Sequence, residues 1–186
     1  MMRRLADPAV DCQNLRLYDS DTDVIGVSIP ARIRGGVATS IGTVLDQIRA
    51  KAPKAKVVLM GYPQLIDNAG CLTGSNVPGL TVNVSSGEAT WLNSMADLLA
   101  TTMQGVAAAH GATFADPRND FVGAGVCALY GEAIHGIVVG PTPGEIPQAP
   151  WPFERWGPSA QSFHPKKNGT TLYAQSLTRA LRAIGQ

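Results

Sequence analysis

The chain is poor in charged residues, aromatic residues and cysteine. Of its 186 residues, 16% are charged and 6% are aromatic, and only 3 are cysteines. The 15 Lys and Arg residues against 14 Asp and Glu give a formal net charge of +1. This balance offers no excess of positive charge to hold a polyanion, so we expect no nucleic-acid partner.

Long hydrophobic runs are missing as well. Runs such as residues 57–60 are far shorter than the roughly 20 apolar residues that a membrane-spanning helix needs. The first residues, Met1 to Arg4, carry the positive charge of a signal peptide, but no apolar segment follows them. We therefore expect neither a transmembrane segment nor a signal peptide in this chain.

The hydrophobic content, at 45%, is that of a folded protein rather than a disordered one. A chain of this length can build one complete hydrophobic core. We expect a single domain over residues 1–186.

The three cysteines, Cys12, Cys71 and Cys127, lack the short spacings of zinc and redox motifs. We expect no metal site. Cys71 and Cys127 both lie in glycine-rich sequence, where a disulfide could join two long connections. Two buried free thiols fit the same spacing equally well.

Helix and strand patterns alternate along the chain. Residues 37–50 have apolar residues at helical spacing, and residues 54–60 form a short apolar run that ends at Gly61-Tyr62-Pro63. Such a run is typical of a strand buried on both faces, as in a parallel sheet. Residues 64–87 have no sustained period and predict a long excursion at the carboxyl end of that strand.

A second helix and strand follow. Ser85 and Glu88 fit a capping box ahead of a long apolar stripe, and residues 111–116 fit the next parallel strand. Asp116, at the end of that strand, has either a functional role or the role of capping the next turn. The apolar stripe of the helix comprises Leu92, Met95, Ala96, Leu99, Met103, Val106 and Ala107.

The last part of the chain is a proline-rich loop and a helix. Residues 131–157 hold Trp151 and Trp156, which either line a substrate cleft or anchor the loop. Asn168 is predicted to cap the final helix. The apolar positions expected on that helix are Leu172, Leu177, Leu181 and Ile184.

His164 is the strongest candidate for chemistry. It lies between Phe163 and Pro165, just ahead of the final helix, and an imidazole can take up and return a proton near neutral pH. The alternative is a histidine with a purely structural role in its loop.

The order of several short motifs resembles the C-terminal part of the SGNH/GDSL hydrolases, in particular the secreted actinobacterial esterase and lipase branch. The resemblance covers most of the chain from about Cys12 onward. The motifs that carry it are Ile48-Arg49, residues 52–58, Gly61-Tyr62-Pro63, Cys71, Trp91-Leu92-Asn93, residues 111–116, Phe121-Val122-Gly123, Cys127, Ser162-Phe163-His164-Pro165, Gly169 and Tyr173-Ala174.

The resemblance implies a flavodoxin-like three-layer α/β/α fold with a parallel sheet. It also implies a serine that attacks an ester carbonyl, with His164 as the general base, and a disulfide between Cys71 and Cys127. The expected substrate is a small ester or a lipid, no cofactor is expected, and the family is secreted.

This chain departs from the family pattern in its first part. Family members carry Gly-Asp-Ser, a glycine block and Gly-x-Asn-Asp, and none of these precedes Ile48. We therefore expect a chain that lacks the first strands, the nucleophile and the remote oxyanion donors. Association or complementation through the exposed flank of the sheet is then expected.

Two further departures concern the histidine. Gln161 stands where a carboxylate is often found, three residues before His164, and Ala124 replaces a family histidine. In related esterases a backbone carbonyl replaces the carboxylate, which leaves a serine–histidine dyad as an option.

No serine is a convincing nucleophile. Ser20 follows Leu17-Tyr18-Asp19 in the manner of a strand that ends in Asp-Ser, but its aspartate neighbours Asp19 and Asp21 disfavour a nearby oxyanion. A solvated turn is the better interpretation. Ser162 is too close in sequence to His164 to meet it across a cleft, and Ser28, Ser40 and Ser159 are no better.

Two functions therefore remain open. The first is an SGNH-type serine ester hydrolase that is inactive or impaired alone, or is completed by another polypeptide. The second is a non-catalytic remnant that binds an acyl or glycan ligand through the loops that hold Tyr62, Trp151 and Trp156.

Overall fold

The computed structural model describes eight stretches of the chain. Their bounds are residues 16–17, 26–67, 71–74, 81–129, 131–136, 138–141, 156–158 and 161–185. Side chains are described in all of these except residues 71–74, 81–84, 139–141 and 156–158.

A parallel pair of strands lies at the centre of the molecule. β3 (Val58–Met60) pairs in parallel with β6 (Thr113–Ala115), and Val58 lies opposite Thr113. Parallel strands need a long crossover, and α4 (Ser86–Ala109) provides it. Both strands predicted from the apolar runs are confirmed.

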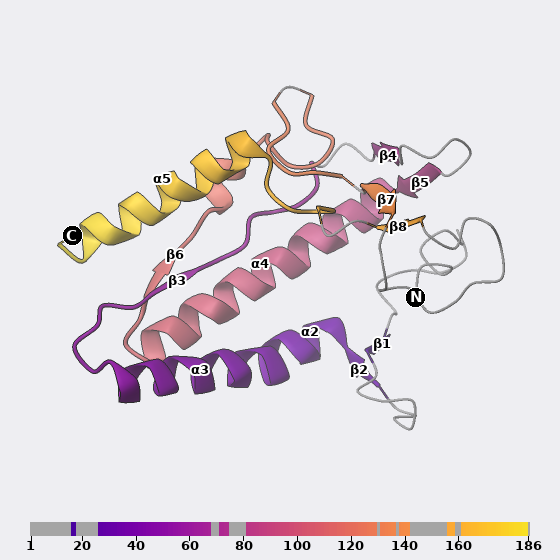
Figure 1. Cartoon of the computed structure of the whole chain (residues 1–186). Helices are drawn as coiled ribbons and strands as arrows, with labels where there is room; N and C mark the ends of the chain where they lie inside the picture. Colours follow the sequence, from indigo (N-terminus) through magenta and orange to yellow (C-terminus); the bar gives the residue numbers. More distant parts are fainter. Residues whose placement is uncertain are drawn as a thin grey trace.

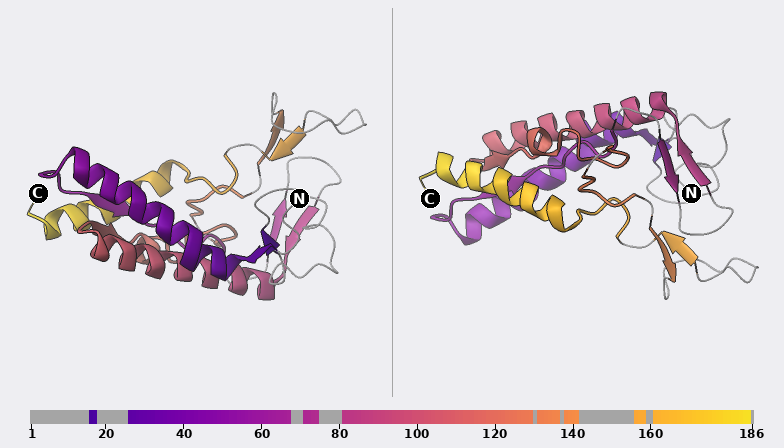
Figure 2. Two further views of the ribbon diagram at one scale, coloured as in Figure 1. Left: turned by 90° about the horizontal axis from the view of Figure 1, so that it is seen from below. Right: turned by 90° about the horizontal axis from the view of Figure 1, so that it is seen from above.

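Helices cover both sides of the strand pair. α5 (Lys167–Ala183) lies on one side, and α4 with α3 (Ala38–Lys51) lies on the other (Figures 1 and 2). The fold is thus a mixed α/β arrangement around a parallel pair.

Among the described residues, three antiparallel two-stranded ribbons lie toward one end of the molecule (Figures 1 and 2). They are β1 (Arg16–Leu17) with β2 (Val27–Ser28), β4 (Cys71–Gly74) with β5 (Thr81–Val84), and β7 (Val139–Pro141) with β8 (Trp156–Pro158). The long excursion predicted for residues 64–87 therefore holds a ribbon, because its strands pair with each other rather than with the sheet.

The first helical segment is longer than the sequence predicts. α2 (Ile29–Arg32) and a π-helical turn (Ile33–Val37) lead directly into α3. Pro30 occupies the start of α2, where its missing N–H costs nothing. The predicted helix over residues 37–50 is confirmed.

α4 begins as its sequence predicts. The Ser85 hydroxyl accepts from the Glu88 N–H at 3.2 Å, and the Glu88 carboxylate accepts from the Ser85 N–H at 2.9 Å. The predicted apolar stripe lies against the rest of the molecule, with Met103 and Ala107 fully buried. The capping box and the core face are confirmed.

α5 differs from its prediction in two respects. Lys166, not Asn168, is the N-cap residue, because the Asn168 side chain donates to the Gly131 and Glu132 carbonyls instead. Leu177 is 38% exposed, and the buried face consists of Gly169, Ser176 and Ala180. These small residues let the helix pack closely, with Gly169 against Ala133 and Pro165 and Ser176 against Asp116 and Asp120.

The amino ends of the strands are closed by basic side chains. The three long helices end there (Figure 1), so their terminal carbonyls gather at that end. The Arg49 guanidinium donates to the Gly111 carbonyl at 2.7 Å, and the Lys56 ammonium donates to the Ile184 carbonyl. Cations are favoured at helix C-termini, so this basic group stabilises the fold.

Candidate active site

The loop that carries His164 is tied to the opposite end of the molecule from these basic residues. The chain after β3 makes a parallel bridge from Ile66 to Val126, and Ile134 makes an antiparallel bridge to Pro165. The buried residues Phe121, Val126, Ala133 and Ile134 form the core beneath these bridges. His164 is therefore placed beyond the carboxyl end of β3, where α/β folds commonly carry their sites.

The backbone of His164 is fixed by its neighbours. The His135 N–H donates to the His164 carbonyl at 2.9 Å, and the Phe163 N–H donates to the His135 carbonyl at 3.1 Å. Phe163 has a φ of 60°, a left-handed conformation that is uncommon outside glycine. Such strained residues persist only where surrounding contacts hold them, and they gather at functional sites.

One contact of the His164 imidazole favours one of its two neutral tautomers. Its Nδ1 lies 3.1 Å from the Ser162 carbonyl oxygen. A carbonyl can only accept, so in the neutral ring this contact favours the proton on Nδ1 and the lone pair on Nε2. The ring is exposed to solvent, and Nε2 can act as the acceptor that a general base needs.

The structure brings few of the other predicted site residues together with His164. Ser20, Trp151 and Cys12 lie outside the described residues, and Trp156 is described only as backbone in β8. Tyr62 follows β3 directly and is 55% exposed. Among the described residues, no serine hydroxyl is hydrogen-bonded to the His164 ring.

Two of the described serines that lie in this part of the molecule have structural partners. The Ser162 hydroxyl donates to the Val138 carbonyl and accepts from the Val138 N–H, both at 3.1 Å. Ser176, which the sequence patterns did not single out, is 1% exposed and donates to the Asp120 carboxylate at 2.5 Å. Neither hydroxyl is directed to the histidine.

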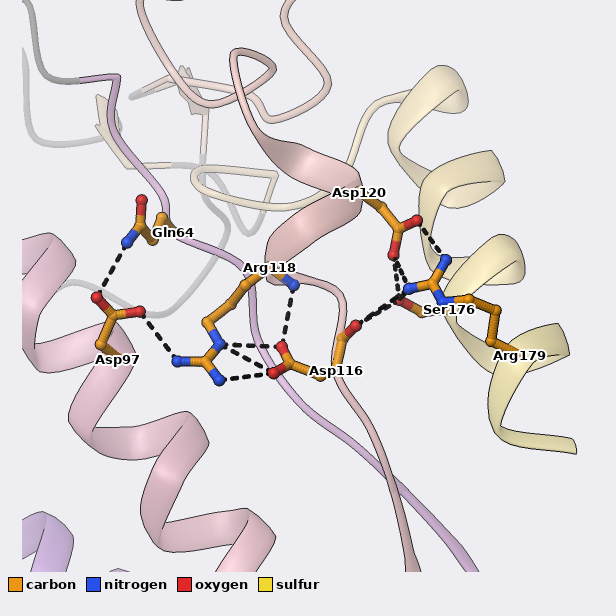
Figure 3. Close-up of polar contacts among 7 residues, drawn as sticks. All are labelled: Gln64, Asp97, Asp116, Arg118, Asp120, Ser176 and Arg179. Atoms are coloured by element: carbon orange, nitrogen blue, oxygen red, sulfur yellow. Dashed lines mark hydrogen bonds and ion pairs between the residues drawn. The ribbon is translucent and has the colours of Figure 1, made fainter. Parts of the chain in front are cut away.

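A network of acids and arginines crosses the carboxyl end of the strands (Figure 3). Arg118 lies between Asp97 of α4 and Asp116, and Arg179 of α5 binds Asp120. The Asp116 carboxylate also accepts the Arg118 backbone N–H at 3.1 Å. The predicted turn-capping role of Asp116 is confirmed.

The arginines change the acidity of their partners. The Arg118 guanidinium holds the pKa of Asp116 below its ordinary value, and the Arg179 guanidinium does the same for the pKa of Asp120. Both carboxylates are therefore charged at neutral pH and are fully occupied by arginine. This network joins α4 to α5 and has no free acid that could serve His164.

A small pocket opens beside this network. Its volume is only about 130 Å³, which is smaller than the roughly 300 Å³ at which drug-sized ligand pockets begin. His164 and Tyr62 do not line it. The lining residues are Gln64, Ile66, Asp67, Arg118, Phe121, Val122, Gly123 and Gly125.

Polar groups to which the sequence patterns gave no role also shape this region. Asn93 is 5% exposed within the apolar face of α4, and its side chain bonds the backbone of Ile66. The position of this polar residue within an apolar stripe was the signal for its buried role. Glu132, which bonds Lys166 and the Cys127 N–H, gave no such signal because it lies in an irregular loop.

The sulfur of Cys127 is in a disulfide, and its partner lies outside the described side chains. Cys127 itself is in the left-handed region, with a φ of 70°. Cys71 is described only as backbone, in β4.

Within the described stretches, no three His, Cys, Asp or Glu side chains are grouped so that they could hold a metal ion. No helix in the same stretches is long and apolar enough to cross a membrane.

Comparison with known proteins places the chain beside bacterial lipases. Lipase 1 of Streptomyces coelicolor is 33% identical over 115 residues, which cover 56% of this chain and 40% of the lipase. No family model matches the chain. The chain is related to the Streptomyces lipases.

Solved structures give the same relationship. The phospholipase A1 of Streptomyces albidoflavus matches with a TM-score of 0.62 and 27% identity, and an extracellular lipase of Streptomyces rimosus matches with 0.58 and 26%. Each match covers 81% of this chain and 53% of the other. The resemblance to SGNH hydrolases is thus confirmed, and the chain spans about half the length of these lipase relatives.

Proposed function

We propose that this chain is the histidine-bearing part of an SGNH-type serine ester hydrolase that acts on a small ester or a lipid. The observation that carries the proposal is the His164 ring, whose Nδ1 lies 3.1 Å from the Ser162 carbonyl. The relationship to Streptomyces lipases supports it.

In the proposed reaction, His164 is the general base. Its Nε2 takes the proton of a serine hydroxyl as the serine oxygen attacks the ester carbonyl. The Ser162 carbonyl stabilises the resulting imidazolium through the Nδ1–H, in place of a carboxylate. The imidazolium then gives its proton to the leaving alcohol, and water releases the acid with His164 again as base.

In this proposal, the nucleophilic serine and the remote oxyanion donors come from a segment other than the described residues, in this protein or in another polypeptide. The open edge of β3 is the place where that segment completes a three-layer, flavodoxin-like fold. Among the described strands β6 alone pairs with β3, and parallel strands are normally covered on both sides. We further propose that the chain works outside the cell, because the related lipase of Streptomyces rimosus is extracellular.

A groove along this edge supports the proposed association. It has a volume of about 290 Å³ and lies between α3 and β3, where Val44 is 53% exposed and Ile48 is 38% exposed. Apolar side chains make up most of its wall, which suits a strand or helix of a partner. The lining residues are Ser40, Ile41, Val44, Leu45, Ile48, Val57, Val58 and Leu59.

Cys71 is the proposed partner of Cys127 in the disulfide. β4 carries Cys71 within the long connection that follows β3, and Cys127 is disulfide-bonded. Peptide mapping without reduction should recover one linked pair that contains both residues. A pair that contains Cys12 instead would contradict this assignment.

An ester assay tests the function. The chain is offered a short-chain activated ester alone, and then together with the part of the Streptomyces albidoflavus phospholipase A1 that it does not match. Turnover is expected in the mixture, and His164→Ala should remove it. Equal rates for the wild type and His164→Ala would overturn the proposal.

The second candidate is a non-catalytic protein that binds an acyl or glycan ligand through the loops with Tyr62, Trp151 and Trp156. The 55% exposure of Tyr62 next to β3 favours it, because an exposed ring can stack on a ligand. Titration with a fatty acid and with an oligosaccharide should then show binding that Tyr62→Ala weakens and His164→Ala leaves unchanged. Binding that is unaffected by Tyr62→Ala would exclude this role for the loop.

A further inference from the structure

Two segments far apart in sequence hold the His164 loop. Residues 161–166 run beside residues 133–135, and the Lys166 N–H donates to the Ala133 carbonyl at 2.8 Å. Bonds between His135 and both Phe163 and His164 complete the contact. The position of the imidazole therefore depends on where residues 133–135 are held.

Glu132 fixes that position from the preceding residue. One carboxylate oxygen accepts the Cys127 N–H at 2.8 Å, and the other accepts the Lys166 ammonium at 2.7 Å. Its own carbonyl accepts from the Asn168 side chain at 3.0 Å. Glu132 thus joins the disulfide loop to residues two and four positions after His164.

The Glu132 carboxylate is charged in this setting. Burial alone would raise the pKa of Glu132, but the hydrogen bonds from Lys166 and from the Cys127 N–H outweigh burial and lower it. Both Glu132 and Lys166 are about one-third exposed, with side-chain exposures of 35% and 32%. A charge-assisted bond of this kind sets geometry more firmly than a neutral one.

The backbone is strained at both ends of the contact between the disulfide loop and the His164 loop. Cys127 and Phe163 are the non-glycine residues with positive φ in the described part of the chain, at 70° and 60°. Glu132 binds the N–H of Cys127, and His135, three residues later, binds the N–H of Phe163. Left-handed conformations at such residues need this kind of external support.

We propose that Glu132 is a positioning residue for His164. It acts through Lys166 and Cys127 and does not touch the His164 ring, whose Nδ1 is bonded to the Ser162 carbonyl. Its relevance to catalysis rests on the proposed ester hydrolysis, but its effect on the position of the imidazole does not.

The imidazole spectrum provides a test that needs no activity. The chain has 3 histidines, so NMR of the ring nitrogens gives three separable sets of signals, and His164→Ala identifies its own. Glu132→Gln keeps an oxygen for the Cys127 N–H but loses the charge, whereas Glu132→Ala loses both contacts. Asp46→Asn is the matched control, because Asp46 binds His110 at 2.6 Å in a separate ion pair.

We expect the His164 signals to shift in Glu132→Gln, and more in Glu132→Ala, with the His110 signals unchanged. Asp46→Asn should shift His110 alone. In the double variant Glu132→Lys with Lys166→Glu, the His164 signals should move partway back to their wild-type positions. The double variant restores the ion pair but not the acceptor for the Cys127 N–H. If Glu132→Ala does not fold, the shift of the His164 signals in Glu132→Gln alone tests the proposal.

A lower melting temperature with unmoved His164 signals in Glu132→Gln would overturn the proposal, since Glu132 would then support only the fold. In the ester assay of the completed protein, Glu132→Gln should lower kcat by up to about a hundredfold with little change in KM. If that assay shows no turnover for the wild type, the proposed function fails while the NMR result on Glu132 still stands.

Discussion

Asn93 of α4 holds the backbone of Ile66 from both sides. Its side-chain NH₂ donates to the Ile66 carbonyl at 2.6 Å, and its side-chain oxygen accepts the Ile66 N–H at 3.3 Å. Ile66 is 3% exposed and bridges to Val126, so this contact anchors the first step of the path from β3 to the His164 loop.

Replacing Asn93 should therefore destabilise the protein. Asn93→Ala leaves a buried N–H and a buried carbonyl without their partner, which should lower the free energy of unfolding by about 2–4 kcal/mol. Urea unfolding measures the change. Ser94→Ala is the control, because Ser94 is exposed and bonds only within its own helix, to the Trp91 carbonyl. Equal losses in the two variants would contradict the anchoring role of Asn93.

Two glycines should respond in opposite directions to the same substitution. A Cβ at Gly169 would come within 3.0 Å of Pro165 and still closer to the Ala133 carbonyl, whereas a Cβ at Gly105 would meet nothing within 4 Å. Gly169→Ala should cost about 1–3 kcal/mol by pushing α5 away from the loop. Gly105→Ala should gain about 0.5–1 kcal/mol from helix propensity. Thermal unfolding of both variants checks this, and a stabilising Gly169→Ala would disprove the close approach.

Stability should fall in acid because of Asp116 and Asp120. Bonds from Arg118 and Arg179 lower the pKa of each carboxyl from its ordinary value of 3.8 in the folded state. Each carboxylate therefore stabilises the fold at pH values above its ordinary pKa. This contribution is lost as the pH falls through the lower pKa of the folded state. Urea unfolding between pH 7 and pH 2 should show little change above about pH 5 and a decline below about pH 4.

Asp120→Asn tests the origin of this decline. The variant should be less stable than the wild type at pH 7, and its stability should fall less steeply in acid, because the group that takes up a proton is gone. An unchanged slope in both Asp120→Asn and Asp116→Asn would assign the acid sensitivity to other groups.

The groove between α3 and β3 should govern self-association of the isolated chain. Val44→Lys places a charge in the apolar wall without disturbing the core, since Val44 is 53% exposed. Sedimentation velocity should show a smaller share of dimers and larger species for this variant. Val122→Lys, at a loop valine that is 78% exposed and lies outside the groove, should leave the distribution as it is. The same shift in both variants would rule out a specific role for the groove.

Much of the framework followed from local patterns in the sequence. The capping box at Ser85 and Glu88 and the strand that ends at Met60 depend on neighbouring residues, and the structure confirms both. The prediction that Asn168 is the N-cap of α5 was wrong, because the contacts of Asn168 are with residues far away in the sequence. Its side chain donates hydrogen bonds to the carbonyls of Gly131 and Glu132. No local sequence pattern indicates these contacts.

The candidate site was predictable only in part. His164 was identified from its place before a proline and a helix, but the acceptor for its Nδ1, the Ser162 carbonyl, is a backbone atom that any residue could supply. Glu132 was missed because its partners, Cys127 and Lys166, meet it only after the loops fold together.

The sequence by itself indicated the three long helices, the parallel strands, the relationship to the lipases and His164 as the candidate histidine, because these depend on periodicity and short motifs. Only the tertiary structure decided which way the histidine ring is protonated, which glycine allows close packing and which acid supports the histidine loop. Those outcomes depend on contacts between residues far apart in the chain. Chain order alone does not fix such contacts, because they form only when the helices and loops pack against one another.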